Sequence, residues 1–379
     1  MINSQVRNKV EVQLIQEDLF QLLLAYKRLS SLSEEGGYLA FAILPMVGFV
    51  LDEVLNYLNK NKIAYLIEDS NEELNRIHHR LKKIRAQIKL FDNTEGYSDG
   101  LIKALSLAHT KSKLFFSKSH KGWRAWVRFV QPDLGVFFKD QFLINTTHTI
   151  IPSLGFSLKE LEKLPPEKLP LETQEQCKKY GYELGEILGE LASVFKINSL
   201  SVDFYEQKND KLNISHNDFV GKIFYQEVAH LLELESDNLA SSLVMALAQI
   251  NTVLYVLPEL INKESNLLFR MRFLTAYHSS VVLTQCLRKD FFLNQELLTF
   301  LQNKFLRNTC AHYGIRMKDW DFEESGCFFS NIVEHNTSLG FEEAQHKISK
   351  VLHLMSKYLT DKVSKKSLAR KKSIWGSNT

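Results

Sequence analysis

The sequence predicts a mainly α-helical protein with one small β-hairpin near the middle of the chain. Composition is the first reason, because the 379 residues include only 7 Pro and 16 Gly, which disfavours a turn-rich sandwich or barrel. The second reason is that apolar residues recur at helical spacing through most of the chain. The third is a cluster of four of the seven prolines between Pro152 and Pro170, which indicates a boundary between two helical regions.

Residues 1–150 are expected to form a helical N-terminal region. Apolar positions spaced three and four apart predict helices at 8–31, 38–59, 72–90 and 99–117. Ser70 or Asn71 is a suitable N-cap for the third of these helices. The segment 121–143 has no clear pattern.

Residues 151–235 are expected to contain a Pro-rich linker, one helix at 172–195 and a hairpin at 201–216. The hairpin is predicted because apolar and polar residues alternate on both sides of the polar turn QKND. A further helix is expected at 219–234.

Residues 236–360 are expected to form a helical bundle, with helices at 237–261, 266–289, 293–313 and 341–359. Residues 361–379 are rich in Lys and Arg and are expected to be a disordered basic tail.

Two segments carry most of the positive charge. Residues 100–132 contain seven Lys or Arg and no acidic residue, and the chain after Asp361 contains six Lys or Arg and no acidic residue. The whole chain has a net charge of only +3, so the remainder is acidic. Two basic segments on an acidic body predict a polyanionic partner, and RNA is the one that we expect.

The four cysteines are scattered, without a C-x-x-C pair, so neither a zinc site nor a disulfide framework is expected. We expect no metal and no cofactor. The first residues lack the apolar core of a signal peptide. The apolar segments Tyr38–Leu51 and Leu239–Leu257 are too short or too interrupted by polar residues for membrane spans. These features predict a cytoplasmic protein with buried apolar helices.

The stretch FLRNTCAHYG, residues 305–314, concentrates polar groups at the end of an apolar helix. Asn308 and His312 are four residues apart and stack on one helix face. Arg307 lies about 140° from His312 around the axis, so one helix does not easily direct both at the same atom. A purely structural role is also open: His312 suits a helix C-terminus, Gly314 suits a helix end, and Arg307 could pair with a surface carboxylate.

This stretch resembles the Arg-x(4–6)-His signature of the HEPN superfamily, in which a polar residue often follows the arginine. The corresponding residues here are Arg307, Asn308 and His312. The helix before it, LLFRMRFLTAYHSSVVLTQCLRK, also resembles the one that precedes the motif in that family. The resemblance covers about residues 236–360 and implies a HEPN-like bundle there. It does not extend to the first 235 residues.

The resemblance implies a metal-independent endoribonuclease that acts on single-stranded RNA. Histidine ordinarily titrates near pH 6.5 and can exchange a proton with the 2′-hydroxyl of RNA. Arg307 would hold the phosphate, and Asn308 would orient the imidazole or bind a phosphate oxygen. Tyr313 and His278 are accessory candidates, although packing roles explain them as well. Family sites are usually composite, so one motif per chain implies a homodimer or pairing with a second, degenerate HEPN-like bundle in the same chain. A regulatory protein is a further expected partner. The family also implies a role in toxin or antiviral defence.

A basic and aromatic stretch, KSKLFFSKSHKGWRAWVRF at 111–129, is a second candidate for RNA binding. Cations interleaved with aromatic rings suit single-stranded nucleic acid, although an amphipathic segment with buried rings has the same pattern. Its candidate contact residues are Lys118, Lys121, Trp123, Arg124 and Arg128. The helix RIHHRLKKIRAQIK at 76–89 is also basic, and a solvated face is the simpler interpretation of Arg76, Arg80 and Lys83.

Two other functional classes remain open from the sequence. The same bundle could hold a nucleotide or RNA through Arg307 and His312 without cutting it. Alternatively, the chain could be a helical scaffold for protein interactions in which the motif has no chemical role.

Overall fold

The fold was analysed in a computed structural model, which describes thirteen parts of the chain. These are residues 4–32, 34–63, 71–88, 107, 110–111, 114, 136–146, 158–197, 214–217, 237–286, 293, 295–313 and 328–375. Within them the protein is mostly helical with one small sheet, which confirms the predicted fold class.

The N-terminal region contributes three long helices: α1 (Ser4–Ser31), α2 (Glu34–Asn61) and α3 (Asn71–Ile88). They pack in sequence order, α1 against α2 and α2 against α3. The contact between α2 and α3 is close, because a Cβ on Gly48 would lie 2.7 Å from the Cγ2 of Ile84. Glycine at this position therefore lets the two helices approach each other.

The short helix α7 (Leu158–Lys163), the 3₁₀ turn Pro166–Lys168 and the helix α8 (Leu169–Val194) follow in the region expected to be a linker. The buried Lys111 ammonium donates hydrogen bonds to the carbonyls of Glu162 and Leu164, which holds the end of α7. The helix α8 packs on α1, so this part of the chain belongs to the body of the protein.

The sheet has three antiparallel strands in the order β2-β1-β3. The strands are β1 (Val136–Lys139), β2 (Phe142–Thr146) and β3 (Ile214–Asn217). The hairpin that the structure describes is β1–β2, with Asp140 in the turn at a φ of 55°, a conformation that Asp tolerates. Of the expected hairpin at 201–216, the structure describes only the end, where Ile214–Asn217 form β3 and pair with β1; residues 201–213 lie outside the described part.

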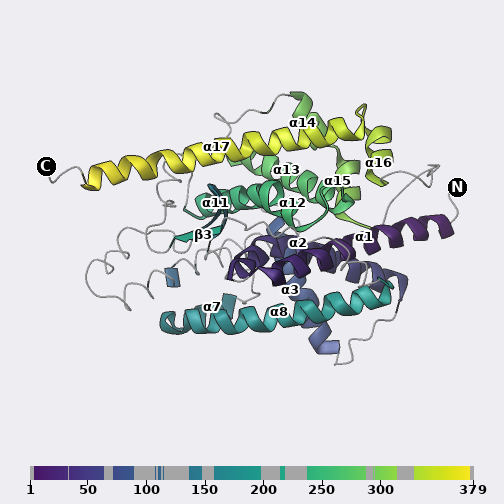
Figure 1. The fold of residues 1–379 in the computed structure, drawn as a ribbon, viewed down its shortest axis with the longest axis horizontal. Helices are drawn as coiled ribbons and strands as arrows, with labels where there is room; N and C mark the ends of the chain where they lie inside the picture. The colour runs from purple at the N-terminus through teal and green to yellow at the C-terminus, as the bar shows by residue number, and fades with distance from the viewer. Residues whose placement is uncertain are drawn as a thin grey trace.

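The C-terminal helices surround α13 (Asn266–Cys286). They are α11 (Asp237–Asn251), a π-helical turn (Thr252–Val256), α12 (Leu257–Leu260), α14 (Gln295–Leu301), α15 (Lys304–Ala311), α16 (Phe328–Asn336) and α17 (Phe341–Trp375). Figure 1 shows α17 along one side of the molecule, α1 and α2 through the middle, and α8 on the opposite side.

Three expectations need correction or stay open. The predicted helix 293–313 is interrupted, because Asn303 leaves the helical conformation and caps α15 by accepting a hydrogen bond from the Leu306 N–H. The predicted disordered tail instead continues α17 as helix to Trp375. The helix expected at 219–234 lies outside the described residues.

One hydrophobic core extends from Leu14 to Leu359 and contains residues of both expected regions, so it does not divide near residue 235. The side chains of α1 also bond directly to the C-terminal helices. Glu17 accepts a hydrogen bond from the Asn266 N–H at the start of α13, and Gln21 accepts one from the Asn262 N–H. The helix α1 is therefore an integral part of the bundle.

A buried ion pair between Asp18 and Arg270 lies at the centre of this contact, and neither side chain is exposed to solvent. The Asp18 carboxylate also accepts a hydrogen bond of 2.6 Å from the Tyr313 hydroxyl, and the Arg270 Nε donates to the Cys310 carbonyl at 2.9 Å. Burial alone would lower the pKa of Arg270, but the Asp18 carboxylate raises it above its ordinary value, so the guanidinium stays charged.

Two described helices, Leu39–Asn61 and Leu243–Leu260, are long and apolar enough to cross a membrane. In each, an 18-residue window is mostly buried inside the protein, 83% and 78% respectively. Such burial fits the core helices that the sequence predicts.

We expect Asp18→Asn to lower the free energy of unfolding by about 3–5 kcal/mol, because it leaves the buried Arg270 charge without a counter-ion. Urea unfolding at pH 7 measures the change, with the exposed Asp361→Asn as the matched control. A loss of less than about 1 kcal/mol would contradict a central role for this pair.

Candidate functional site

His312 occupies the first position after α15, where the chain leaves the helix. Its backbone is extended, with φ of −141° and ψ of 146°. This conformation directs the side chain away from α15 and toward α2, where its Nδ1 lies 3.0 Å from the Oε2 of Glu53. The imidazole is about half exposed (49%), whereas Glu53 is 5% exposed. A buried carboxylate therefore holds one nitrogen of an accessible ring.

Glu53 belongs to a network of charges between α2 and α3. Its second oxygen forms an ion pair with Arg85, and the same Arg85 nitrogen is 2.7 Å from the Oδ2 of Asp52. The other Asp52 oxygen lies 3.0 Å from the Nε2 of His78. Burial raises the pKa of Asp52, but the contacts with His78 and Arg85 outweigh burial and lower it below its ordinary value.

Phe49 of α2 connects this network to the buried pair at the centre of the fold. The Arg85 guanidinium lies 5.5 Å from the centre of the Phe49 ring, and the Arg270 guanidinium lies 5.2 Å from it. Arg270 is also 4.6 Å from the centre of the Tyr313 ring. Cation–π contacts of this kind are favourable when the charge is desolvated, so the ring of Phe49 fixes both guanidinium groups.

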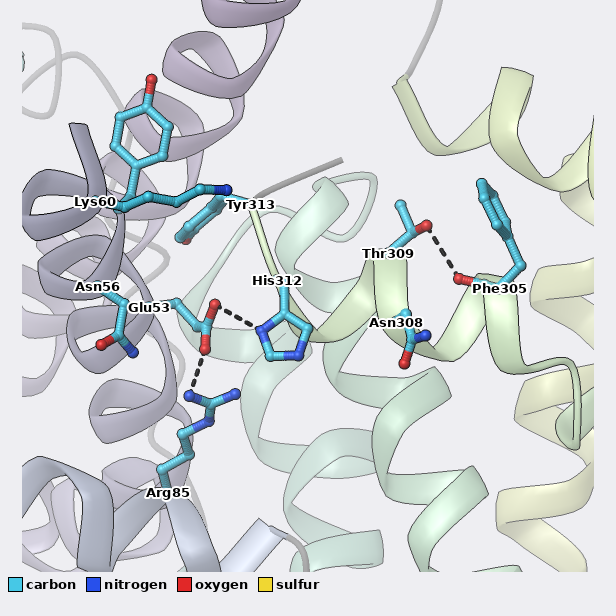
Figure 2. A pocket seen from close by; sticks show the side chains of 10 residues that line it. Glu53, Asn56, Lys60, Arg85, Phe305, Asn308, Thr309, His312 and Tyr313 are labelled. Atoms are coloured by element: carbon cyan, nitrogen blue, oxygen red, sulfur yellow. Dashed lines mark hydrogen bonds and ion pairs between the residues drawn. The ribbon is translucent and has the colours of Figure 1, made fainter. Parts of the chain in front are cut away.

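A pocket of about 570 Å³ opens beside His312, between α2 and α3 on one side and α15 on the other (Figure 2). Its volume lies within the range of small-molecule sites. The residues that line it are Glu53, Asn56, Tyr57, Lys60, Arg85, Phe305, Asn308, Thr309, His312 and Tyr313. Two cations and one carboxylate are among them, but Arg85 is already paired with both Glu53 and Asp52, which leaves Lys60 as the unpaired cation of the described lining.

The contact with Glu53 determines what His312 can do. A carboxylate only accepts hydrogen bonds, so Nδ1 carries the proton and Nε2 is left with a lone pair. Figure 2 shows Nδ1 facing Glu53 and the other ring nitrogen turned away from it. The arrangement therefore suits proton transfer to or from a ligand in the pocket.

The structure brings only some of the predicted site residues together. Asn308 and His312 line the pocket, and the buried Tyr313 lines it as well. Arg307 does not line it: its guanidinium lies 5.6 Å from the ring centre of Tyr277, on α13. His278 is buried beside Tyr277, with ring centres 5.0 Å apart, and is not part of the lining. Arg307 lies on α15, whereas His312 follows the helix in an extended conformation and turns toward Glu53. The expected stacking of Asn308 and His312 on one helix face is therefore wrong, because the helix ends at Ala311.

The predicted RNA-contact residues Lys118, Lys121, Trp123, Arg124 and Arg128 lie outside the described residues. Arg80, which the sequence places on a solvated face, is instead mostly buried. It forms an ion pair of 2.8 Å with Glu183 of α8 and lies over the Tyr180 ring. Within the described parts of the chain, no group of three or more His, Cys, Asp or Glu side chains could hold a metal ion.

Sequence reasoning missed Glu53, Lys60 and Arg85 as site residues. A signal for Glu53 was present, because Asp52 and Glu53 interrupt the otherwise apolar segment AFAILPMVGFVLDEVLNYL. Adjacent acidic residues in a core helix need partners. The sequence does not reveal that the partners are His312 and Arg85, 259 and 32 positions away along the chain.

The chain matches no family model, and neither the curated proteins nor the solved structures give a match. The resemblance to the HEPN superfamily therefore remains an expectation from the motif residues.

We expect the stability of Asp52→Asn to depend less on acid than that of the wild type. Because the pKa of Asp52 is lowered in the folded protein, its ion pairs stabilise the fold fully above the ordinary pKa of 3.8. That contribution is lost as the pH falls below this value. Urea unfolding at pH 7 should show a loss of about 1–3 kcal/mol for Asp52→Asn, and the difference should shrink at pH 3.

The exposed Asp361→Asn serves again as the control, since it should follow the wild type at both pH values. A constant difference between wild type and Asp52→Asn from pH 7 to pH 3 would contradict the lowered pKa.

Proposed function

We propose that this protein is a metal-independent endoribonuclease that cleaves single-stranded RNA, with His312 as its proton-transfer residue. The supporting observation is the geometry of His312: a buried carboxylate holds one ring nitrogen, and the half-exposed ring lines a pocket that also contains Lys60. The motif Arg307, Asn308 and His312, with its resemblance to the HEPN superfamily, gives the reaction class.

In the proposed reaction, Nε2 of His312 takes the proton from a ribose 2′-hydroxyl. The 2′-oxygen then attacks the adjacent phosphorus, and the bond from phosphorus to the 5′-oxygen breaks. The 5′-oxygen takes a proton from solvent. The products are a 2′,3′-cyclic phosphate and a 5′-hydroxyl end. RNA supplies its own nucleophile, so the reaction needs no metal-bound water.

Glu53 is a positioning residue in this proposal, because it touches His312 and not the reacting atoms. It sets the tautomer and stabilises the imidazolium that forms when His312 accepts the proton. Arg85 in turn holds Glu53 through an ion pair.

Arg307 has a different place in the proposal. Within one chain it is directed at Tyr277 and away from the pocket of His312. If Arg307 contacts the RNA that His312 cleaves, it does so from a second copy of the chain. The proposed enzyme is therefore a homodimer with a composite site, acting in the cytoplasm, and a role in toxin or antiviral defence is part of the same proposal.

The separation of Arg307 from His312 also favours a second candidate, an RNA- or nucleotide-binding module that does not cut. In that case RNA would bind in the pocket and leave unchanged.

We expect the purified protein to cleave single-stranded RNA in excess chelator, and His312→Ala to reduce the rate about 10²–10⁴-fold, the usual contribution of a positioned acid or base. Gel analysis of labelled RNA, with identification of the cyclic phosphate end, measures both. The control is His346→Ala, which changes an exposed histidine on α17. Cleavage that requires a metal, or full activity of a folded His312→Ala protein, would refute the mechanism.

We expect Glu53→Gln to lower kcat about 10–100-fold with KM near the wild-type value, because the amide keeps the shape but cannot stabilise the imidazolium. Steady-state cleavage kinetics measure the two constants separately. The exposed Glu342→Gln is the matched control. A change in KM alone would assign Glu53 to substrate binding and contradict its positioning role.

A further inference from the structure

We propose that Lys60 binds the phosphate of the RNA in the pocket beside His312, a role that the motif would give to Arg307. The inference rests on the proposed function, since it names the group that recognises the substrate at the same site. It assigns this function to the last turn of α2, in the part of the chain to which the motif does not extend.

The first argument concerns the positive charges that line the pocket, which are Lys60 and Arg85. One nitrogen of Arg85 forms ion pairs with both Asp52 and Glu53, and its side chain is only 12% exposed. Two carboxylates already neutralise this guanidinium. Its charge is therefore already balanced, and it attracts a phosphate less strongly than a cation that has no carboxylate partner.

The second argument concerns Arg307. Its guanidinium lies over the Tyr277 ring, and its Nε is buried without a hydrogen-bond partner. To reach the pocket of its own chain, this side chain would have to leave the ring and cross to the other side of α15. Within one chain, Arg307 therefore lies on the side of α15 that faces away from the pocket.

Lys60 has neither constraint. It is exposed, it lines the pocket, and within the described parts of the chain it forms no ion pair. Figure 2 shows its side chain extending from α2 toward Tyr313, the neighbour of His312. An ammonium carries three hydrogen-bond donors on a flexible stem. The ammonium can therefore contact a phosphate in several positions as the substrate binds beside the imidazole.

The rest of the pocket fits the same ligand. Asn56 and Asn308 contribute amides from opposite sides, and an amide offers both donors and an acceptor to a base or sugar edge. A phosphodiester with one adjacent nucleoside is the chemical class that uses a cation, a general base and two amides together.

The experiment uses a fluorescent 2′-O-methyl oligoribonucleotide, which keeps the phosphates but lacks the nucleophile. Binding is measured by anisotropy on the full chain at several salt concentrations, for wild type, Lys60→Gln and Lys62→Gln. Lys62 is the matched control because it is exposed, lies two residues away and does not line the pocket.

We expect Lys60→Gln to weaken binding about fivefold at low salt, the equivalent of one screened charge contact. The slope of log K against log salt should become shallower by about 0.7, the value for one phosphate contact on a single strand. Lys62→Gln should leave both quantities near their wild-type values.

Equal affinity and slope for Lys60→Gln and wild type would overturn the inference. An equal loss of affinity in Lys62→Gln would also overturn it, because the effect would then come from the overall electrostatic field of the protein. A wild-type protein that does not bind the probe would overturn it as well. Because the probe cannot be cleaved, failure of catalysis is observed separately. If the wild type cuts no RNA but binding depends on Lys60, the ribonuclease proposal fails while the assignment of Lys60 stands.

Discussion

The fold depends on one buried ion pair, Asp18 of α1 with Arg270 of α13. Both charges are fully removed from solvent, so each is tolerated only because the other is present. The same pair reaches the end of α15, since Asp18 accepts a hydrogen bond from Tyr313 and Arg270 donates to the carbonyl of Cys310. Three segments far apart in sequence are thus joined through two side chains.

The candidate site follows from this connection. Cys310 and Tyr313 lie on either side of His312 in the sequence, so their bonds to the buried pair fix the backbone on which His312 stands. The acidic residue that meets its ring comes from α2, which packs against α1. The N-terminal helices therefore supply half of the pocket, and the site does not belong to the C-terminal bundle alone.

The sequence predicts most of the long helices, but it does not predict the helix break at Asn303 or the strand pairing. Helical spacing correctly predicts α1, α2, α3, α8 and α13 to within a few residues, because buried apolar residues recur along each of them. The break between α14 and α15 was missed, because apolar residues continue across it and only the Asn303 cap interrupts the helix. The β1–β2 hairpin is local but begins in the segment 121–143, where the sequence has no clear pattern. The pair β1–β3 joins segments far apart in the chain, and an alternating pattern does not encode such a contact.

Of the three motif residues, Asn308 and His312 line the pocket, whereas Arg307 lies over the Tyr277 ring. The estimate of about 140° between Arg307 and His312 assumed one continuous helix, but α15 ends at Ala311 and His312 is extended. Glu53, Lys60 and Arg85 could not be assigned from sequence, because their importance comes from packing of α2 and α3 against the end of α15. The partner of a charged residue in a helix can be identified only when the position of the neighbouring helix is known.

Phe49 gives the architecture one more property. The guanidinium groups of Arg85 and Arg270 both lie within 5.5 Å of the centre of its ring, so one phenyl ring contacts both the structural cation and the cation beside the pocket. An aliphatic side chain of similar bulk would fill the space but offer no negative π-cloud to either cation. Natural variants of this chain should therefore keep an aromatic residue at this position.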